Sequence, residues 1–99
     1  MEIVVLAGAE ADLFEAWRRY EGCLPGLGNE FDRAVRAGLL SVVQFPESAP
    51  HFEAGYRRLL LRRFGHGIFY RVHGERLVVV AVLDLRQDPA MIRQRLVIS

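Results

Sequence analysis

The spacing of apolar side chains changes along the chain and divides its first half into three predicted elements. Residues 3–6 form a short apolar run that Gly8 interrupts, which predicts a strand. In two longer segments, apolar residues then recur every three or four positions, as on the buried face of a helix. Their apolar stripes are Leu13, Trp17, Tyr20 and Leu24 in the first segment, and Leu27, Phe31, Val35, Leu39 and Val42 in the second. Pro25 and Gly26 separate the segments, so we expect a helical hairpin laid on a sheet.

The second half of the chain has the pattern of an antiparallel meander. Two prolines in residues 45–50 end the second helix, and three apolar-rich runs follow at residues 56–63, 68–73 and 77–83. Residues 64–67 and 74–75 contain glycine and are expected to form the turns between them. The last run is almost wholly apolar, which predicts a central strand covered on both faces. Pro89 then favours one or two helical turns over residues 89–96.

The predicted elements follow the order βααβββ, which is of the α+β class. We expect a small twisted, antiparallel-rich sheet packed against a helical hairpin, with a short C-terminal helix. A length of 99 residues suits one domain, residues 1–99. A signal peptide begins with a positively charged region, whereas this chain has the acidic Glu2 there, which favours a first strand over a signal peptide. No apolar run approaches the ~20 residues of a membrane span, so no membrane association is expected.

Side chains alternate across a strand, and this assigns two faces to residues 68–73. We expect the helices to cover the apolar face, which carries Ile68, Tyr70 and Val72. The opposite face is then open, and its predicted residues are Phe69, Arg71 and His73, joined by Arg58 and Arg62 of the preceding strand and by Arg86 at the rim. Arginines interleaved with aromatic rings can hold a phosphate backbone and stack on a base, and they can equally hold an acidic peptide.

Charge is distributed unevenly around a net charge of only +1. Residues 1–49 contain eight acidic side chains and four arginines, whereas residues 50–99 contain four acidic side chains and nine arginines. The basic second half predicts a surface for phosphates or for an acidic protein partner, and the alternative is a solvated sheet face. All 13 basic residues are arginine, which excludes lysine chemistry, although a coding bias explains the absence of lysine equally well.

The other reactive side chains form no recognisable site. The three histidines, at positions 51, 66 and 73, are scattered without metal-ligand spacing, so we expect neither a metal nor another cofactor. Cys23 is the only cysteine, which excludes an internal disulfide and fits a reducing cytoplasm. Because no base partner is apparent, we expect a small buried or half-buried thiol rather than a nucleophile. Trp17 is likewise expected in the core rather than as a binding anchor.

A polar cluster, residues 84–88, follows the last predicted strand. Asp84 and Asp88 are four residues apart, but Pro89 prevents them from pairing along one helix. Asp84 can accept hydrogen bonds from Arg86 or from an arginine of residues 56–63. A structural salt bridge is therefore favoured over a catalytic role for Asp84.

Several short pieces, taken in order, resemble the RelE/ParE superfamily of bacterial toxins over nearly the whole chain. These are Ala11-Asp12-Leu13, Gly28 and Phe31, Pro46, Tyr56-Arg57-Arg58, Phe64, Ile68 with Tyr70 and Val72, Val80-Ala81-Val82, and Arg86-x-Asp88-Pro89 followed by Arg95. The resemblance implies a RelE-like fold and the toxin of a type II toxin–antitoxin pair. A small cognate antitoxin would bind and neutralise such a toxin.

Two toxin mechanisms occur on this fold, and the resemblance implies one or the other. RelE-like toxins cut messenger RNA in the ribosomal A site with basic residues and often a tyrosine near the C-terminus, whereas ParE-like toxins inhibit DNA gyrase. Arg86 matches the basic residue that the nucleases carry after the last strand, and Arg58 falls near one on an earlier strand. With Asp84 as a substitute base, these are the weak candidates for RNase residues.

Departures from the nuclease pattern favour the ParE-like branch. Asp84 stands where relatives often have histidine, and Gln87 replaces the second arginine of a terminal pair. Gly67 and Ile92 fall near positions where the nucleases place an arginine and a tyrosine. We therefore predict a gyrase inhibitor, with a ribosome-dependent endoribonuclease or an inactive relative as alternatives. The predicted target- or antitoxin-facing residues are Arg58, Arg62, Phe69, Arg71, His73, Arg86, Arg93 and Arg95.

Overall fold

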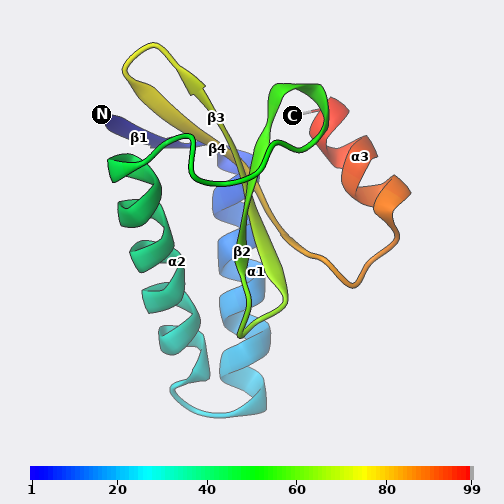
Figure 1. Ribbon diagram of the computed structural model, residues 1–99. Coiled ribbons are helices and arrows are strands. Elements are labelled where there is room, and N and C mark those ends of the chain that lie inside the picture. The colour runs from blue at the N-terminus through cyan, green and yellow to red at the C-terminus, as the bar shows by residue number, and fades with distance from the viewer. Residues whose placement is uncertain (99) are drawn as a thin grey trace.

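The computed structural model describes residues 1–98, and their elements follow the predicted βααβββ order with a C-terminal helix. They are strand β1 (Glu2–Val5), helices α1 (Ala7–Cys23) and α2 (Leu27–Gln44), a 3₁₀ turn η1 (Glu53–Gly55), strands β2 (Arg57–Leu61), β3 (His66–His73) and β4 (Arg76–Asp84), and helix α3 (Pro89–Val97). Figure 1 shows α1 and α2 side by side as a hairpin, with α3 apart from them beside the strands. The α+β prediction is confirmed.

The sheet has the strand order β1-β4-β3-β2, so β4 is central as predicted. β2, β3 and β4 are antiparallel neighbours, whereas β1 runs parallel to β4, from Glu2 opposite Arg76 to Val5 opposite Val79. A parallel neighbour cannot be joined by a tight turn, and the helical hairpin lies in the long connection between these two strands. Because β1 has four residues and β4 has nine, β4 extends past its partner beyond Val79.

Some element boundaries and burial states differ from the predicted ones. His66 and Gly67, expected in a turn, begin β3 by pairing with the end of β2. Leu24, expected on the buried stripe of the first helix, is 57% exposed because α1 ends at the preceding residue. Cys23 is also exposed, so the prediction of a buried or half-buried thiol is wrong. Trp17 is partly buried but does not belong to the core cluster.

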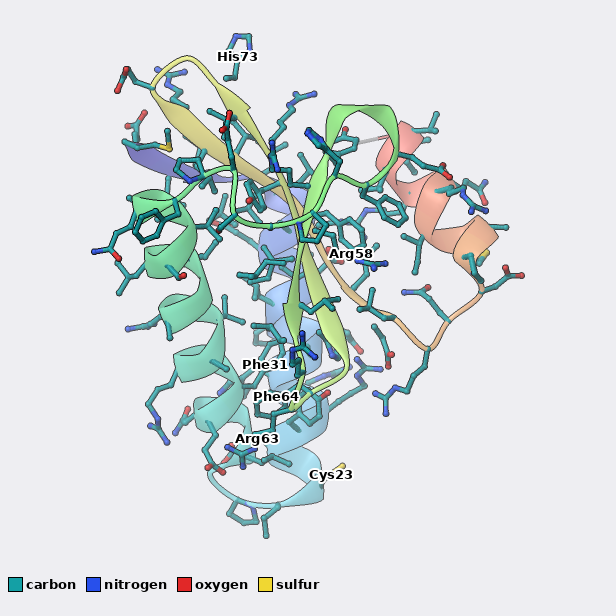
Figure 2. The ribbon with its side chains drawn as sticks, viewed as in Figure 1. Cys23, Phe31, Arg58, Arg63, Phe64 and His73 are labelled. Carbon is teal, nitrogen blue, oxygen red and sulfur yellow. The ribbon has the colours of Figure 1, made fainter. Side chains whose placement is uncertain are left out.

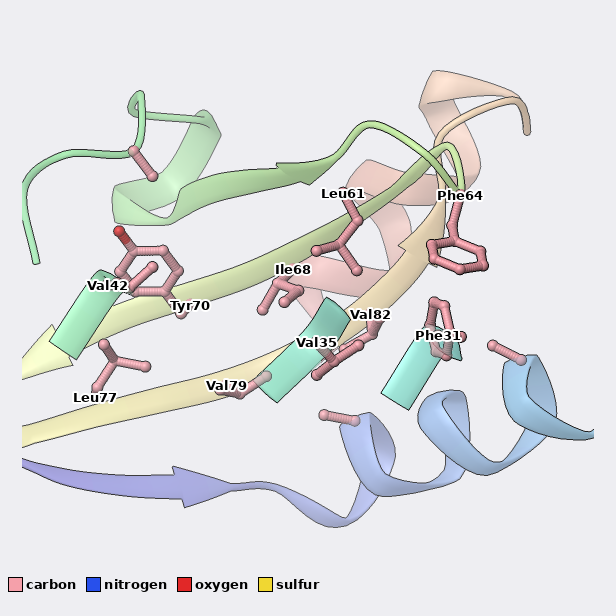
Figure 3. Close-up of a cluster of buried hydrophobic side chains, with 13 residues drawn as sticks. Phe31, Val35, Val42, Leu61, Phe64, Ile68, Tyr70, Leu77, Val79 and Val82 are labelled. Atoms are coloured by element: carbon pink, nitrogen blue, oxygen red, sulfur yellow. The ribbon is translucent and has the colours of Figure 1, made fainter. Parts of the chain in front are cut away.

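The helical hairpin packs on one face of the sheet through buried apolar side chains (Figure 3). α2 contributes Phe31, Val35 and Val42, and the strands contribute Leu61, Ile68, Tyr70, Leu77, Val79 and Val82. The inward orientation predicted for Ile68 and Tyr70 is thereby confirmed. Val72 is instead 42% exposed, because β3 continues past the end of α2, and the prediction that the helices cover it is wrong.

The other face of the sheet carries a second buried cluster, which α3 covers. Its members are Tyr56, Phe69, Val80, Ala81, Leu83, Ile92 and Leu96. Phe69 is fully buried and packs edge-on against Phe52, with the ring centres 5.2 Å apart. The prediction that Phe69 lies on an open face is therefore wrong, because α3 and the segment before β2 cover it. A bulge between Phe69 and Tyr70 shifts the register against β4 at this point.

Candidate functional site

Asp84 ends β4, and Arg86 folds back onto it across a turn. The guanidinium binds the carboxylate through two hydrogen bonds, Nε to Oδ1 at 2.9 Å and Nη2 to Oδ2 at 2.8 Å. The backbone N–H of Arg86 also donates to Oδ1, at 2.9 Å. These bonds hold the pKa of Asp84 at about 2, well below its ordinary value. The predicted salt bridge is confirmed, and at neutral pH Asp84 is an ionised and weakly basic carboxylate.

The stem of Arg58 lies over Gly67, the second residue of β3. A Cβ added to Gly67 would be 3.1 Å from the Cγ of Arg58 and 3.0 Å from the side chain of Leu85. The Arg58 guanidinium lies 5.2 Å from the centre of the Phe52 ring, which is a cation–π contact. Glycine at position 67 therefore lets Arg58 and Leu85 pack closely on β3. An arginine at that position would have to displace one of them.

The turn between β2 and β3 lies next to both candidate arginines. The guanidinium of Arg86 lies against Gly65, while the stem of Arg58 lies over Gly67, two residues further along. Asp84 is the β4 partner of the first residue of β3. The structure thus brings the three RNase candidates to the same end of the sheet, although Asp84 neutralises one of the two arginines.

The remaining predicted residues of the sheet surface do not gather with this group. Arg71 lies on the far half of β3, with its guanidinium 5.9 Å from the centre of the Tyr56 ring. His73 is exposed at the tip of the β3–β4 hairpin (Figure 2). Arg62 is exposed in the turn after β2, and Phe69 is buried. The predicted surface is therefore divided between the two ends of β3.

The two arginines of α3 make ion pairs within the chain. Arg93 Nε donates to Glu53 Oε1 at 2.8 Å, and both side chains are more than half exposed. Arg95 pairs with both carboxylate oxygens of Asp12 on α1, at 2.8 Å each. The side chains of Arg95 and Asp12 are only 27% and 14% exposed. Arg95, predicted as a partner-facing residue, thus attaches α3 to α1.

Asp12 has a second role, which the sequence pattern does not predict. Its Oδ2 accepts a hydrogen bond from the backbone N–H of Val82 at 3.0 Å. Val82 lies on the part of β4 beyond Val79, where β1 has ended and no longer pairs with it. The carboxylate from α1 therefore takes the place of the missing strand. In the sequence, the only indication of this contact is that the first apolar run is much shorter than the last.

A buried histidine lies next to the β2–β3 turn. His66 is 1% exposed, and its Nδ1 lies 3.0 Å from the carbonyl oxygen of Phe64 and 3.2 Å from the hydroxyl of Tyr20. The Tyr20 hydroxyl donates to the same carbonyl at 2.8 Å. Burial lowers the pKa of His66 and raises the pKa of Tyr20. The sequence pattern misses this cluster because the residues are far apart in the chain.

A polar cavity of about 430 Å³ lies between α1 and the end of β4, beside His66 and the Asp84–Arg86 pair. Its other charged lining residues are Asp12, Glu15 and Arg19 of α1. Within residues 1–98, no three or more histidine, cysteine or acidic side chains lie together as metal ligands would. No helix in the same residues is long and apolar enough to cross a bilayer.

Residues 3–89 match the family described as the ParE toxin of the type II toxin–antitoxin system parDE. The matched segment contains the whole helical hairpin and the strands β2 to β4. The chain belongs to the ParE toxin family. Among curated proteins, none matches this ParE-family chain in sequence.

Two solved structures share the fold of this ParE-family chain. A chain of the chromosomal ParDE system from P. aeruginosa superimposes with a TM-score of 0.76 at 19% identity, covering 87% of this chain and 97% of the other. The isolated RelE toxin of E. coli gives a TM-score of 0.61 at 17% identity, covering 99% of this chain and 98% of the other. The predicted RelE/ParE-like fold is thereby confirmed.

Proposed function

We propose that this ParE-family chain is a toxin that inhibits DNA gyrase in the cytoplasm and that a cognate antitoxin neutralises it. Membership of the family supports a toxin with an antitoxin partner. The observation that favours gyrase over messenger RNA as the target is the doubly hydrogen-bonded ion pair of Asp84 and Arg86. In a cell that lacks the antitoxin, the expected consequence is arrested growth.

Cleavage of RNA by its own 2′-OH needs a base for that hydroxyl and a cation for the charge on the phosphate. Asp84, with a pKa of about 2, is a weak base, and its negative charge would repel a phosphate. Arg86 already uses two of its three guanidinium nitrogens to bind Asp84. His66 is 1% exposed and its Nδ1 lies within hydrogen-bond distance of the Phe64 carbonyl, so a substrate has little access to it. The geometry therefore supports a binding toxin better than a nuclease.

One observation favours the alternative, a ribosome-dependent endoribonuclease. Arg58 and Arg86 lie on either side of the same turn at one end of the sheet. If a bound RNA displaced Asp84 from Arg86, the Arg86 guanidinium would be available to bind a phosphate. The two functions therefore make opposite predictions for the same purified protein.

A supercoiling assay tests the proposed target directly. The purified chain should block the supercoiling of relaxed plasmid by gyrase or trap cleaved DNA, as seen by gel electrophoresis. Primer extension on translated messages with the same protein should show no cuts in the ribosomal A site. An unaffected gyrase at stoichiometric excess of the chain would overturn the assignment, and A-site cuts that disappear in Arg86→Ala would establish the nuclease instead.

Controlled expression in a bacterium without antitoxin separates the same targets in cells. Gyrase inhibition should produce filamentous cells with a DNA-damage response, whereas messenger RNA cleavage should stop translation abruptly. Normal growth at a verified level of folded protein would identify an inactive relative.

A further inference from the structure

A cavity of about 770 Å³ lies between the α2–β2 connection and the β3–β4 hairpin, at the other end of β3 from Asp84. Three of its lining residues are apolar and exposed, namely Met1 at 45%, Phe45 at 66% and Val72 at 42%. Its basic and imidazole side chains are Arg57, Arg71 and His51. Exposed apolar side chains gathered around one basic cavity are typical of a site for another molecule.

The wall of this cavity is held in place by side chains of the sheet. Arg57 Nη1 donates to the carbonyl oxygens of Glu47 and Ala49, at 3.0 and 2.7 Å. The hydroxyl of Tyr70, a fully buried residue of β3, donates to the carbonyl oxygen of Pro46 at 2.9 Å. The connection is therefore ordered before anything binds, which lowers the entropic cost of binding.

The cavity also borders a free strand edge. β2 begins at Arg57, opposite Tyr70, but β3 continues to His73 (Figure 1). Within residues 1–98, the end of β3 pairs only with β4. In a hairpin with a two-residue turn, the residues that flank the turn bond to each other, here His73 and Arg76. Because the hydrogen-bonding direction alternates along an antiparallel strand, the N–H and C=O of Val72 point away from β4, into the space beyond the first residue of β2.

The charge beside this edge is positive. Arg57 is committed to the loop carbonyls, whereas Arg71 contacts the Tyr56 ring and forms no ion pair within the described residues. Glu47 is the one acidic residue in the lining of the cavity. An acidic ligand is therefore favoured over a basic one.

We propose that this edge receives an extended acidic segment of a partner protein. The segment adds a short strand beside Val72, places an apolar side chain among Met1, Phe45 and Val72, and directs a carboxylate to Arg71. The inference rests on the proposed function, because an antitoxin is the partner which that function requires. A second copy of the chain fits less well, because pairing two such edges would bring two sets of arginines together.

Two capped seven-residue peptides with the same Leu-Val-Leu centre test the proposal. One is flanked by aspartate and glutamate, the other by arginine and lysine, and binding is followed by fluorescence anisotropy and by the backbone amide shifts of the isotope-labelled full chain. The acidic peptide should bind, shift the amide of Val72 and protect it from hydrogen exchange. The basic peptide should not bind.

Two variants and a control distinguish a specific site from general attraction. Arg71→Glu should lower the affinity for the acidic peptide at least about tenfold and raise the affinity for the basic peptide. Phe45→Ala should lower the affinity for the acidic peptide without raising the affinity for the basic one. Leu40→Ala removes an apolar side chain of α2 that is 65% exposed and lies outside the cavity, and it should leave binding unchanged. Because all three side chains are exposed, the amide spectra should confirm that the variants remain folded.

Several outcomes would overturn the proposal. The two peptides could bind equally well, neither could bind, or Arg71→Glu could leave the affinity for the acidic peptide unchanged. A concentration-dependent shift of the Val72 amide in the peptide-free chain would also overturn it, because the edge would then serve self-association. The gyrase assay uses the chain without any peptide, so the two results are separable. If the acidic peptide does not bind but the chain inhibits gyrase, this inference alone is overturned. If the peptide binds specifically but gyrase is unaffected, only the assignment of gyrase as the target is overturned.

Discussion

The partner of each arginine determines what that arginine can do in this molecule. Arg86, Arg93 and Arg95 are each paired with a carboxylate of the same chain. Arg58 and Arg71 instead lie over aromatic rings, where the charge is stabilised without being neutralised. The positive charge that remains for a partner is therefore concentrated along β2 and β3 rather than on α3.

The pairing of Asp84 with Arg86 can be tested by titration. In Arg86→Ala, the pKa of Asp84 should rise from about 2 toward its ordinary value of about 3.9, because the hydrogen bonds from Arg86 are the largest cause of the shift. A depressed folded-state pKa stabilises the fold above the unfolded value, and this contribution is lost as the pH falls from about 4 to about 2. The carboxyl ¹³C shift of Asp84 measures the midpoint. Arg93→Ala removes another ion-paired arginine and should leave that midpoint in place.

Burial of His66 predicts a loss of stability on mild acidification. Because burial lowers its pKa in the folded state, the unfolded chain binds the proton more readily, and stability should fall as the pH drops below about 6.5. Urea denaturation at a series of pH values measures this slope. His66→Gln should flatten the slope, and a variant curve parallel to that of the wild type would show that other groups cause the loss.

At the scale of elements, the two helical units are attached to the sheet differently. The α1–α2 hairpin packs through a broad apolar cluster, whereas α3 contributes only two buried residues, Ile92 and Leu96. The start of α3 is stabilised by Pro89 in its first turn and by the side chain of Asp88, which accepts from Ala90 N. The ion pair between Arg95 and Asp12 then adds a directional attachment to α1.

Asp12 should therefore be important for stability although it lies on no predicted site. Asp12→Ala should lower the free energy of unfolding by about 2–4 kcal/mol, since it removes the carboxylate from both Arg95 and the N–H of Val82. Asp12→Asn keeps a hydrogen-bond acceptor for the N–H of Val82, so it should lower the free energy of unfolding by less than Asp12→Ala does. Urea denaturation measures these free energies of unfolding. As a control, Glu15→Ala replaces an exposed carboxylate of the same helix and should leave the free energy of unfolding within about 0.5 kcal/mol of the wild-type value. Wild-type stability in Asp12→Ala would contradict the role of this attachment.

At the scale of the whole molecule, β3 connects two separate regions that contain arginine side chains. One lies at His66, beside the Asp84–Arg86 pair, and the other at Val72. The six residue steps between them correspond to roughly 20 Å of strand, more than the screening length of about 8 Å at physiological ionic strength. A partner segment on the Val72 edge would therefore not have to cover Arg86.

This separation predicts that the two ends of β3 can be altered independently. Arg86→Glu should leave the affinity for the acidic peptide within about twofold of the wild-type value, because its charge is screened at that distance. Arg71→Glu, at the edge itself, is the contrasting variant. Anisotropy titrations at physiological salt measure both, and a large loss in Arg86→Glu would show that the two regions act as one surface.

The sequence by itself determined the elements, their order, the central position of β4 and the resemblance to the RelE/ParE superfamily. These follow from the spacing of apolar residues and from short motifs, which are local properties of the chain. Only the tertiary structure decided which sheet face is covered and which arginines stay available. α3 buries Phe69 through Ile92 and Leu96, and Arg95 pairs with Asp12 across 83 residues. Such contacts depend on how distant segments meet in space, which local spacing does not specify.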